Sequence, residues 1–408
     1  MRILMIADFY HPYVGGVEQH VRTLSHGLAR RGHSVLVSTL DHPERPEYEL
    51  DGQVRVARMR GLAQRSARLH EHAHRRWAPP MPDPSITRAL NGLVRRFKPD
   101  VVHGHEWLAR SYLPLKPLHP ARLVMSLHYY TLSCAKKTLM QAGEPCSGPA
   151  PGKCFACARE HFGDAKGPLV LALHRSGSIA ERRLVDHYIA VSNATAEGNR
   201  VAGRDNLTVI PNFLPHRADR TEVSGELVSR LPDEPYFLFV GDFRRDKGLD
   251  VLLEAYAQVA EPPPLVLIGK TWTEAAPSVP TGVVNLGEWP SAAVQVAWER
   301  CLAGVVPSVW AEPFGLVVIE ALRAGKPVIA SRSGGIPEII EDGHTGLLVR
   351  PDAPADLAEA LARVAQDGVL REQLGRNARV AAGAYREEIG VTRTESVYRG
   401  LIAGRNAA

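Results

Sequence analysis

The fold is decided by RILMIADFYHPYVGGVEQHVRTLSHGLARRGHSVLVSTL, residues 2–40. The first eight residues form a short apolar run typical of a buried strand, and a turn with Gly15 and Gly16 follows. From His20 the apolar residues are spaced as on one face of a helix that ends at Gly32, and SVLVSTL resumes as a second strand. Strand, glycine loop, helix and strand make a βαβ unit, so the sequence predicts a parallel sheet.

The same pattern recurs in the second half, at PYFLFVGDF, RRDKG, LDVLLEAYAQVA and PLVLIG, which begin at residue 235. Further strands are predicted at VVNLG, AGVVPS, PVIAS and GLLVR, and in the first half at DVVHGHEW, LVMSLHYY and HYIAVSN. A chain of 408 residues exceeds what one core usually fills. We therefore expect an α/β protein with two doubly wound, Rossmann-like domains facing each other across a cleft.

The domain boundaries are predicted from the polar segment at residues 216–235. The N-terminal domain is expected to span residues 1–215 and to carry a cysteine-rich loop at 134–157. The C-terminal domain is expected to span residues 216–385. A final helix, residues 386–408, is expected to pack back on the N-terminal domain.

The composition is that of a globular protein, with 45% hydrophobic and 23% charged residues. No run approaches the ~20 apolar residues of a membrane span, and MRILMIADFY lacks the features of a signal peptide, so a cytoplasmic chain is expected. Residues 1–220 carry 31 Lys and Arg against 19 Asp and Glu, whereas residues 221–408 carry 18 against 25. The basic excess is densest at residues 55–76, which suggests a solvated face or an anionic partner, including peripheral contact with the inner face of a membrane. No nucleic-acid partner is expected, because no nucleic-acid module is present.

Two motifs carry the chemistry of the C-terminal half. GDFRRDKGLD, residues 241–250, places Arg244, Arg245 and Lys247 between a strand and a helix start, where backbone N–H groups and nearby cations favour a phosphate. It is not a P-loop, and no GxGxxG follows the first strand.

The second motif is EPFGLVVIEALRAGKPVIA, residues 312–330. Its helix is predicted from about Gly315 to Ala324, which puts Glu312 in the preceding loop and Glu320 inside the helix. The apolar neighbours of Glu320 indicate burial, and a buried carboxylate needs donors, which the hydroxyls of a sugar or ribose could supply. SGGIPEIIEDGHTGLLV, residues 333–349, adds a glycine turn with a second helix predicted to start at Ile336 and Pro337.

These motifs, together with VGGVEQHV near the N-terminus and VIPNF at 209–213, resemble those of the family 4 glycosyltransferases, which have the GT-B fold. The resemblance runs in order from Met1 to about Ala365, and its Glu-x7-Glu element, Glu312 and Glu320, is specific. It implies a retaining hexosyltransferase that moves a sugar from a nucleoside diphosphate sugar to an acceptor hydroxyl of a glycan, a lipid-linked sugar or a small molecule. It also implies that catalysis needs no metal or other cofactor.

The resemblance assigns roles to residues of both halves. Glu320 would bind the ribose hydroxyls of the donor and Glu312 would lie beside the donor sugar, while Lys247 would neutralise the departing phosphate. The remaining matches are the backbone amides of Phe314, Gly315 and Leu316 at the sugar and diphosphate, Gly287 near the base, Gly15 and Gly16 in the loop that approaches the diphosphate and acceptor, and His128 at the reaction centre. The acceptor's proton would pass to the leaving phosphate on the same face of the sugar.

One residue departs from the family pattern. Asp242 stands where the family has an arginine that shares the diphosphate with the lysine. An aspartate repels a phosphate, so Arg244 or Arg245 would have to take over, and Arg244 is the interpretation chosen here.

Four of the five cysteines, Cys134, Cys146, Cys154 and Cys157, lie within 24 residues. Structural zinc is the leading interpretation of this spacing, and a disulfide or redox pair, an iron–sulfur cluster and unligated cysteines stay open. Cys301 is predicted to be a core residue. His103 and His105 either line the cleft or are structural.

Two other functions remain open at this point. A nucleotide-sugar epimerase can share the two-domain architecture and would also hold a diphosphate. The third hypothesis is a sugar-nucleotide-binding protein without catalytic activity, and Asp242 is the residue that favours it.

Overall fold

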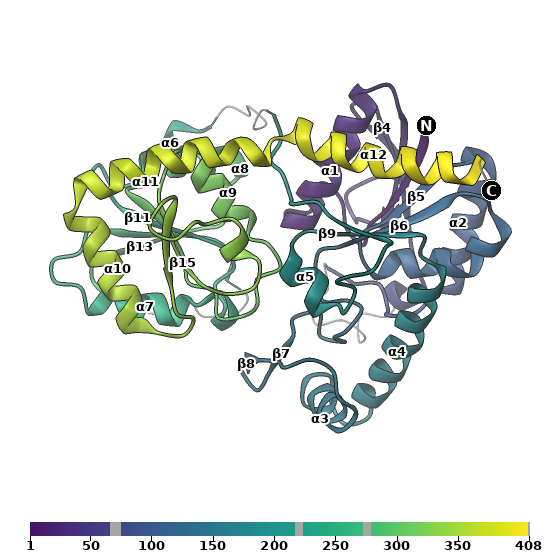
Figure 1. The fold of residues 1–408 in the computed structure, drawn as a ribbon, viewed down its shortest axis with the longest axis horizontal. Coiled ribbons are helices and arrows are strands. Elements are labelled where there is room, and N and C mark those ends of the chain that lie inside the picture. The colour runs from purple at the N-terminus through teal and green to yellow at the C-terminus, as the bar shows by residue number, and fades with distance from the viewer. Residues whose placement is uncertain (66–74, 217–222, 272–278, 407–408) are drawn as a thin grey trace. The chain divides into compact units, whose positions relative to one another are not determined.

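The computed structural model describes residues 1–65, 75–216, 223–271 and 279–406 (Figure 1). The chain divides into two compact units. The first comprises Met1–Ala142, Cys146–Asn212 and Glu387–Ala408, and the second comprises Gly143–Pro145 and Phe213–Arg386. The main divisions therefore fall after residues 212 and 386, where the sequence places them after residues 215 and 385.

The first unit is built on an eight-stranded sheet of order β10-β9-β6-β5-β1-β2-β4-β3. All neighbouring strands are parallel except β3 and β4, which form an antiparallel hairpin at one edge. The strands are β1 (Arg2–Ile6), β2 (Ser34–Leu40), β3 (Tyr48–Asp51), β4 (Val54–Met59), β5 (Val101–Gly104), β6 (Arg122–Leu127), β9 (His187–Ala190) and β10 (Leu207–Val209), with the short β7 (Met140–Gln141) outside the sheet.

The helices of the first unit are α1 (Gly16–Arg30), α2 (Pro84–Phe97), α3 (Pro151–Phe162), α4 (Lys166–Leu184), α5 (Asn193–Gly198) and α12 (Glu387–Asn406), with 3₁₀ segments η1 (Ala63–Arg65) and η3 (Trp107–Leu118). Helix α3 packs on α4, away from the sheet (Figure 1). Local signals set their ends: Asp83 caps α2 by accepting from the amides of Ser85 and Ile86. The C-terminal helix α12 lies along α1, where Arg31 pairs with Glu395 at 2.9 Å (Figure 1).

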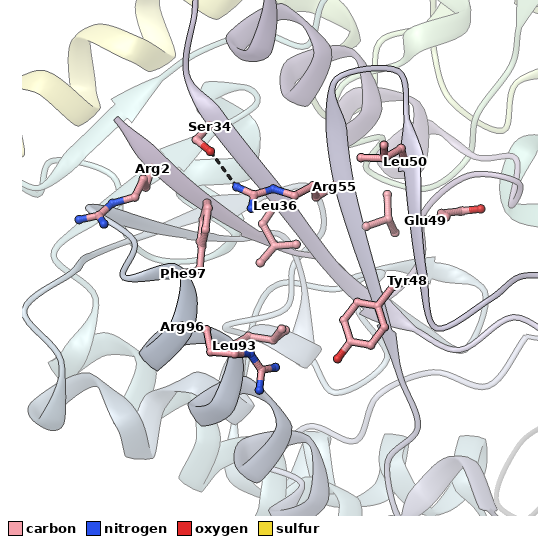
Figure 2. Close-up of a pocket in the computed structure, with 11 residues that line it drawn as sticks. Arg2, Ser34, Leu36, Tyr48, Glu49, Leu50, Arg55, Leu93, Arg96 and Phe97 are labelled. Atoms are coloured by element: carbon pink, nitrogen blue, oxygen red, sulfur yellow. Dashed lines mark hydrogen bonds between the residues drawn. The ribbon is translucent and has the colours of Figure 1, made fainter.

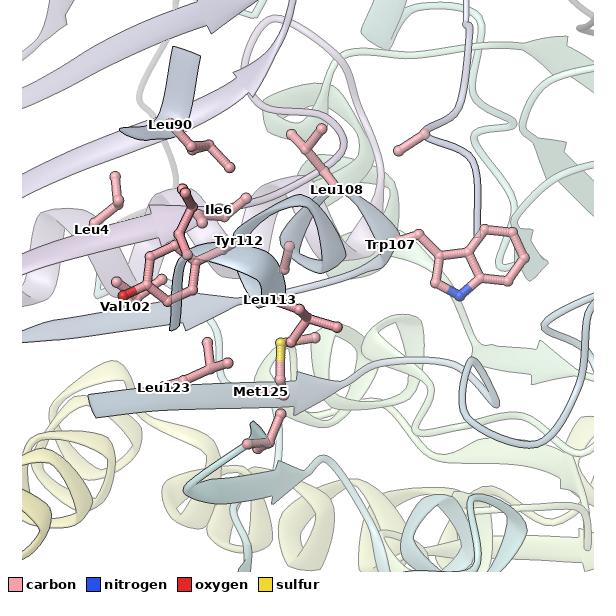
Figure 3. Packing of buried hydrophobic residues seen from close by; sticks show 14 of the residues in the cluster. Leu4, Ile6, Leu90, Val102, Trp107, Leu108, Tyr112, Leu113, Leu123 and Met125 are labelled. Atoms are coloured by element: carbon pink, nitrogen blue, oxygen red, sulfur yellow. The ribbon is translucent and has the colours of Figure 1, made fainter. Parts of the chain in front are cut away.

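The core of the first unit forms because its central strands are buried on both faces, as parallel strands require. Apolar side chains from β1, β5 and β6 meet the buried face of η3 and α2. Figure 3 shows Leu4, Ile6, Val102, Leu123, Met125, Tyr112, Leu113 and Leu90 in this packing. The carboxyl ends of β1, β5 and β6 are thereby held side by side.

The second unit has a six-stranded, wholly parallel sheet of order β13-β12-β11-β14-β15-β16. Its strands are β11 (Phe237–Val240), β12 (Leu265–Ile268), β13 (Val283–Gly287), β14 (Ala303–Val306), β15 (Val328–Ser331) and β16 (Gly346–Val349), with the short β8 (Glu144–Pro145) outside it. Numbered along the unit, this is the 3-2-1-4-5-6 order of a doubly wound fold, and its topological switch point lies between β11 and β14. The predicted α/β class with parallel sheets is confirmed.

The helices of the second unit follow the predicted alternation. They are α6 (Gly225–Val228), α7 (Leu249–Ala257), α8 (Ser291–Arg300), α9 (Leu316–Arg323), α10 (Pro354–Gln366) and α11 (Gly368–Ala381), with 3₁₀ turns η4 (Arg245–Lys247), η5 (Ile336–Glu338) and η6 (Ala382–Tyr385). The helix predicted from Ile336 is wrong, because η5 is a single turn.

Across the described ranges, none of the helices combines the length and apolarity needed to cross a membrane.

Candidate active site

Two loops of the second unit meet at the switch point of its sheet. One follows β11 and contains η4, and the other follows β14 and leads into α9. They are tied by the carbonyl of Asp246, which accepts from the amides of Val309 and Trp310 at 3.0 and 3.3 Å. Ligands of doubly wound sheets bind at such a point, so this is the candidate site of the unit.

Gly248 makes the close approach of these loops possible. Its φ is 76°, and a Cβ placed there would lie 1.8 Å from the carbonyl oxygen of Pro307. A side chain would therefore meet rigid backbone and also strain its own. The glycine of the GDFRRDKG motif is thus a packing requirement that brings Lys247 to the β14 loop.

Lys247 and Glu312 form an ion pair in which the Lys247 Nζ donates to Glu312 Oε2 at 2.8 Å. The same oxygen accepts from the indole Nε1 of Trp310 at 2.7 Å and from Ser308 Oγ at 3.2 Å. Three donors hold one carboxylate oxygen, so the side chain has a defined orientation. The ammonium also lies 4.9 Å from the centre of the Trp310 ring. The structure therefore brings together the two predicted residues Lys247 and Glu312.

The glycine turn at residues 333–335 packs against this pair. Gly335 donates its amide to the carbonyl of Glu312 at 2.7 Å, and Ser333 Oγ donates to the carbonyl of Trp310 at 2.6 Å. These bonds fix the backbone that carries Glu312.

Glu320 lies in α9 and is half-buried. The indole Nε1 of Trp298 in α8 donates to its Oε2 at 3.3 Å, which supplies one donor from the protein itself. Burial raises the pKa of Glu320, while the Trp298 bond and the nearby Arg323 oppose that shift. The helix α9 carries Glu320 one turn beyond its start.

The start of α9 is the predicted diphosphate cradle. Gly315, at a φ of 104°, precedes the first helical residue, Leu316, and Phe314 is buried beside Tyr385. Among the described residues, no backbone carbonyl outside the helix accepts from the amides of Phe314, Gly315 or Leu316. A helix start with unused N–H groups attracts anions.

The two arginines of the motif differ. Arg244 pairs with Asp246 through both Nε and Nη2 at 3.0 Å, so it is engaged within its own loop. Arg245 is exposed and has no ion-pair partner within the described part of the chain. The interpretation that Arg244 replaces the arginine missing at Asp242 stays a prediction, and the pairing of its guanidinium with the Asp246 carboxylate makes Arg245 the alternative.

Gly287 ends β13 with a φ of 71° and lies at the same carboxyl edge of the sheet. Gly15 and Gly16 belong to the first unit, where Gly16 begins α1. Within that unit, Glu18 of α1 pairs with Arg75 from the basic stretch, and Arg58 of the same stretch is buried against Glu49 at 2.6 Å. Arg60 of this stretch also pairs with Asp41 at 3.6 Å, so three of the described arginines in residues 55–76 serve internal ion pairs, and residues 66–74 lie outside the described residues.

His128 lies directly after β6 and is buried beside two other histidines. His105, after β5, makes a 3.1 Å hydrogen bond between its Nδ1 and the Nε2 of His128, and His20 of α1 lies against the His128 ring. Burial lowers the pKa of all three, that of His20 to about 4, so the imidazoles are neutral. His103 is structural, since its two nitrogens bond to Tyr398 and Ser126 at 2.6 and 2.8 Å.

The cysteines at 134, 146, 154 and 157 are all free and half-buried. Burial raises the pKa of the Cys134 and Cys157 thiols. Within the described ranges, the one group of three or more His, Cys, Asp or Glu ligand atoms lying within 4.8 Å of one another is formed by histidines, so the four sulfurs do not form a closed tetrahedral set. The zinc interpretation stays a prediction, and metal analysis of the purified protein checks it. Cys301 is buried and free, as predicted for a core cysteine.

A cluster of buried charges in the first unit was missed by the sequence analysis. Lys137 Nζ lies 3.8 Å from Asp8 and 3.5 Å from Glu106, and 4.2 and 4.5 Å from the ring centres of Trp77 and Trp107. Asp8 and Glu106 follow β1 and β5, so their positions after predicted strands were the available signal. Burial raises the pKa of Asp8, and it raises that of Glu106 to about 8.

The pKa of Glu106 predicts a pH dependence of stability. Between its ordinary value of 4.5 and about 8, folded Glu106 holds a proton that the unfolded chain lacks. Stability therefore falls as pH rises through this window, by up to about 1.4 kcal/mol per pH unit. We expect Glu106→Gln, which mimics the protonated acid, to flatten the change in free energy of unfolding between pH 6.5 and 8, measured by urea unfolding. Identical slopes for the two proteins would contradict this; the buried histidines, which begin to take up protons in the unfolded chain near pH 6.5, contribute equally to both proteins and cancel in the comparison.

A cavity of about 640 Å³ lies elsewhere in the first unit, and no predicted site residue lines it. Its walls combine Arg2, Arg55 and Arg96 with the exposed side chains of Tyr48 and Leu50 (Figure 2). The Arg55 guanidinium donates to Ser34 Oγ at 2.8 Å and lies 4.8 Å from the Phe97 ring centre. The cavity is therefore basic and apolar at once.

Comparisons with known proteins cover both units. A family model described as "Glycosyltransferase Family 4" matches residues 14–217, and one described as "Glycosyl transferases group 1" matches residues 228–381. A D-inositol 3-phosphate glycosyltransferase of Pseudarthrobacter chlorophenolicus is 30% identical over 314 residues, 71% of this chain and 69% of that protein.

Solved structures resemble the whole chain. Sucrose-phosphate synthase from Thermosynechococcus elongatus has a TM-score of 0.74 at 24% identity, with 99% of each chain covered. The Anabaena protein HepE, solved in complex with UDP-glucose, has a TM-score of 0.65 at 18% identity, with 97% of this chain and 99% of that chain covered. At these identities the likeness shows the fold, which is the GT-B fold of glycosyltransferases.

Proposed function

Because the chain belongs to glycosyltransferase family 4, we propose that it transfers a hexose from a nucleoside diphosphate sugar to an acceptor hydroxyl with retention of configuration. The observation that carries this proposal is the Lys247–Glu312 pair beside the open start of α9. A cation and a helix N-terminus favour a diphosphate, and Glu312 and Glu320 offer acceptors to sugar and ribose hydroxyls.

In the proposed reaction, the bond between the sugar's anomeric carbon and the diphosphate oxygen breaks, and a bond to the acceptor oxygen forms on the same face. The proton of the acceptor hydroxyl passes to the leaving diphosphate. Lys247 retains two N–H groups beyond the one given to Glu312, and these stabilise the charge that develops on the diphosphate. No metal is required for this role, because the ammonium and the helix start supply the positive field.

The acceptor side of the proposal involves Gly15, Gly16 and His128 of the first unit. Gly16 begins α1. His128 is the first residue after β6, and its neutral imidazole can donate a hydrogen bond to a hydroxyl or accept one from it. The acceptor is a sugar, either free, within a glycan or lipid-linked.

The test measures binding and turnover separately. In a thermal-shift screen against UDP-, GDP- and ADP-glucose, the cognate donor at 100 times its Kd adds about 2.7 kcal/mol of apparent stability. UDP-glucose is the first choice, since HepE was solved with it. Acceptor-dependent donor consumption giving a product with the donor's anomeric configuration supports the proposal. Sugar-nucleotide conversion without an acceptor would indicate an epimerase instead, and binding without turnover would indicate a binding protein.

We propose Arg245, rather than Arg244, as the second cation of the diphosphate site. Arg245→Ala is expected to weaken binding of the nucleoside diphosphate about 10- to 100-fold, because a charged hydrogen bond contributes about 1.5–3 kcal/mol. Arg244→Ala is the matched control and removes an exposed pair worth at most about 1 kcal/mol. Calorimetric titration with the diphosphate measures both, and a larger loss for Arg244→Ala would reverse the assignment.

We also propose that the basic cavity of the first unit contacts anionic lipid. Arg2, Arg55 and Arg96 complement phosphate head groups, and Tyr48 and Leu50 are apolar and exposed beside them. At low salt the protein should sediment together with phosphatidylserine vesicles. The double variant Arg2→Ala/Arg96→Ala should stay in the supernatant. Equal binding to neutral phosphatidylcholine vesicles would contradict the proposal.

A further inference from the structure

Three histidines of the first unit bring their ring nitrogens together at the carboxyl edge of its sheet. His20 comes from α1, His105 from the end of β5 and His128 from the end of β6. One ligand nitrogen from each lies within 4.8 Å of the other two, and all three residues are buried. Helix and strand elements far apart in sequence thus converge on one point.

The distance between the His105 and His128 nitrogens matches what a tetrahedral metal ion needs. In a site with Zn–N bonds of about 2.0 Å, two ligand nitrogens lie about 3.3 Å apart. His105 Nδ1 and His128 Nε2 lie 3.1 Å apart, so an ion could replace the proton between them with a small rotation of either ring. The nitrogen of His20 supplies the third ligand from the neighbouring helix.

The imidazoles are already in the form that binds a metal. Burial keeps each ring neutral, and a neutral ring offers one lone pair without first losing a proton. In the ring pair, His105 Nε2 and His128 Nδ1 have no hydrogen-bond partner among the described residues. When the ion takes Nδ1 and Nε2, the one proton shared between the rings moves to the outer nitrogen of its own ring, and the other ring already carries its proton there, so the rings release no proton overall.

The surrounding structure holds the ligands in place. A Cβ at Gly104 would lie 2.4 Å from both the Ala109 Cβ and the Met125 sulfur, so the chain packs tightly just before His105. The His103 ring, fixed by Tyr398 and Ser126, lies against His105 with centroids 4.1 Å apart. Preorganised rings lose little freedom when a metal binds.

We propose that His20, His105 and His128 form a binding site for a divalent transition metal of the Zn²⁺, Co²⁺ and Ni²⁺ class. Three imidazoles without a carboxylate favour these ions over Mg²⁺ and Ca²⁺, which prefer oxygen ligands. Three protein ligands leave a fourth position for water or an acceptor oxygen. Occupancy engages His128, and therefore inhibits sugar transfer; this consequence rests on the proposed function.

The test titrates Co²⁺ into the chelator-treated full chain, with no substrate present. We expect one Co²⁺ per chain with the visible d–d bands of a tetrahedral ion, displaced by Zn²⁺. His105→Gln and, separately, His20→Asn should weaken binding at least tenfold, and Cys154→Ser/Cys157→Ser should leave it unchanged. Two single-ligand variants are used so that a folding defect in one, seen in its far-ultraviolet circular dichroism, does not decide the outcome.

The results separate this site from the cysteine loop and from the enzyme activity. Absence of Co²⁺ binding, a thiolate-to-cobalt charge-transfer band, or loss of binding in the cysteine variant would overturn the histidine site. Loss of transfer at the metal concentration that fills the site, relieved by a chelator, is the expected inhibition, and undiminished transfer at saturation would overturn it. Because binding is read without substrate, failure of the proposed function leaves the metal result intact.

Discussion

Lys247→Ala is expected to lower kcat/KM about 10²- to 10³-fold. The substitution removes a preorganised positive charge from the place where the leaving diphosphate gains negative charge in the transition state. The ammonium is held by Glu312 at 2.8 Å and beside the Trp310 ring, so it does not have to find its position during the reaction. Steady-state kinetics with the cognate donor and acceptor measure the loss. Most of it should appear in kcat, because the charge is needed most in the transition state.

A double-mutant cycle with Glu312→Gln sharpens this result. The amide keeps an oxygen for Trp310 and Ser308 but removes the charge that orients Lys247. If the two residues act as a unit, the double variant loses much less than the product of the single losses. Arg376→Ala, which removes an exposed pair with Glu372 on α11, is the control and should retain full activity. Full activity of Lys247→Ala would refute the site assignment.

Arg110→Met is expected to destabilise the first unit by about 3–5 kcal/mol, because it leaves the buried carboxylate of Glu181 without its partner. Arg110 and Glu181 are almost wholly buried and joined at 2.8 Å. The guanidinium also donates to the carbonyls of Pro80 and Thr131 and to Ser178 Oγ. Urea unfolding measures the change.

The double variant Arg110→Met/Glu181→Met tests the cause. With neither charge buried, stability should return most of the way toward the natural protein, since apolar replacements of a buried pair are often neutral. A double variant that is no more stable than Arg110→Met would show that the lost hydrogen bonds of Arg110, rather than the uncompensated charge, carry the effect. The exposed Arg376→Ala variant should change stability by less than about 0.5 kcal/mol.

Local patterns made the fold class readable. Strands such as RILMI and FLFV are apolar on both faces, which is the signature of parallel strands covered by helices. Turn residues such as Gly248 and Gly315 mark the ends of strands and the starts of helices, so the elements around Lys247 and Glu312 could be placed. The helix from Ile336 was misjudged because its extent depends on where β16 begins.

The partners of the predicted residues could not be placed in this way. Trp310, two residues before Glu312, and Trp298, in the preceding helix, are the donors to the two glutamates, yet tryptophans in apolar runs usually indicate core. Asp246 forms an ion pair with Arg244, and the motif GDFRRDKG alone does not predict which of the two arginines pairs with it. These choices depend on side-chain directions within a folded loop.

The order of hydrophobic runs and glycine turns was enough to predict two α/β sheets and the loops in which Lys247, Glu312 and Glu320 lie, because strand and helix periodicity are local properties of the chain. The ion pair of Arg110 with Glu181, 71 residues apart, and the meeting of His20, His105 and His128 were decided by the folded structure. Such contacts form where strand order brings distant segments to one edge of a sheet, and strand order is not written in any single stretch of sequence.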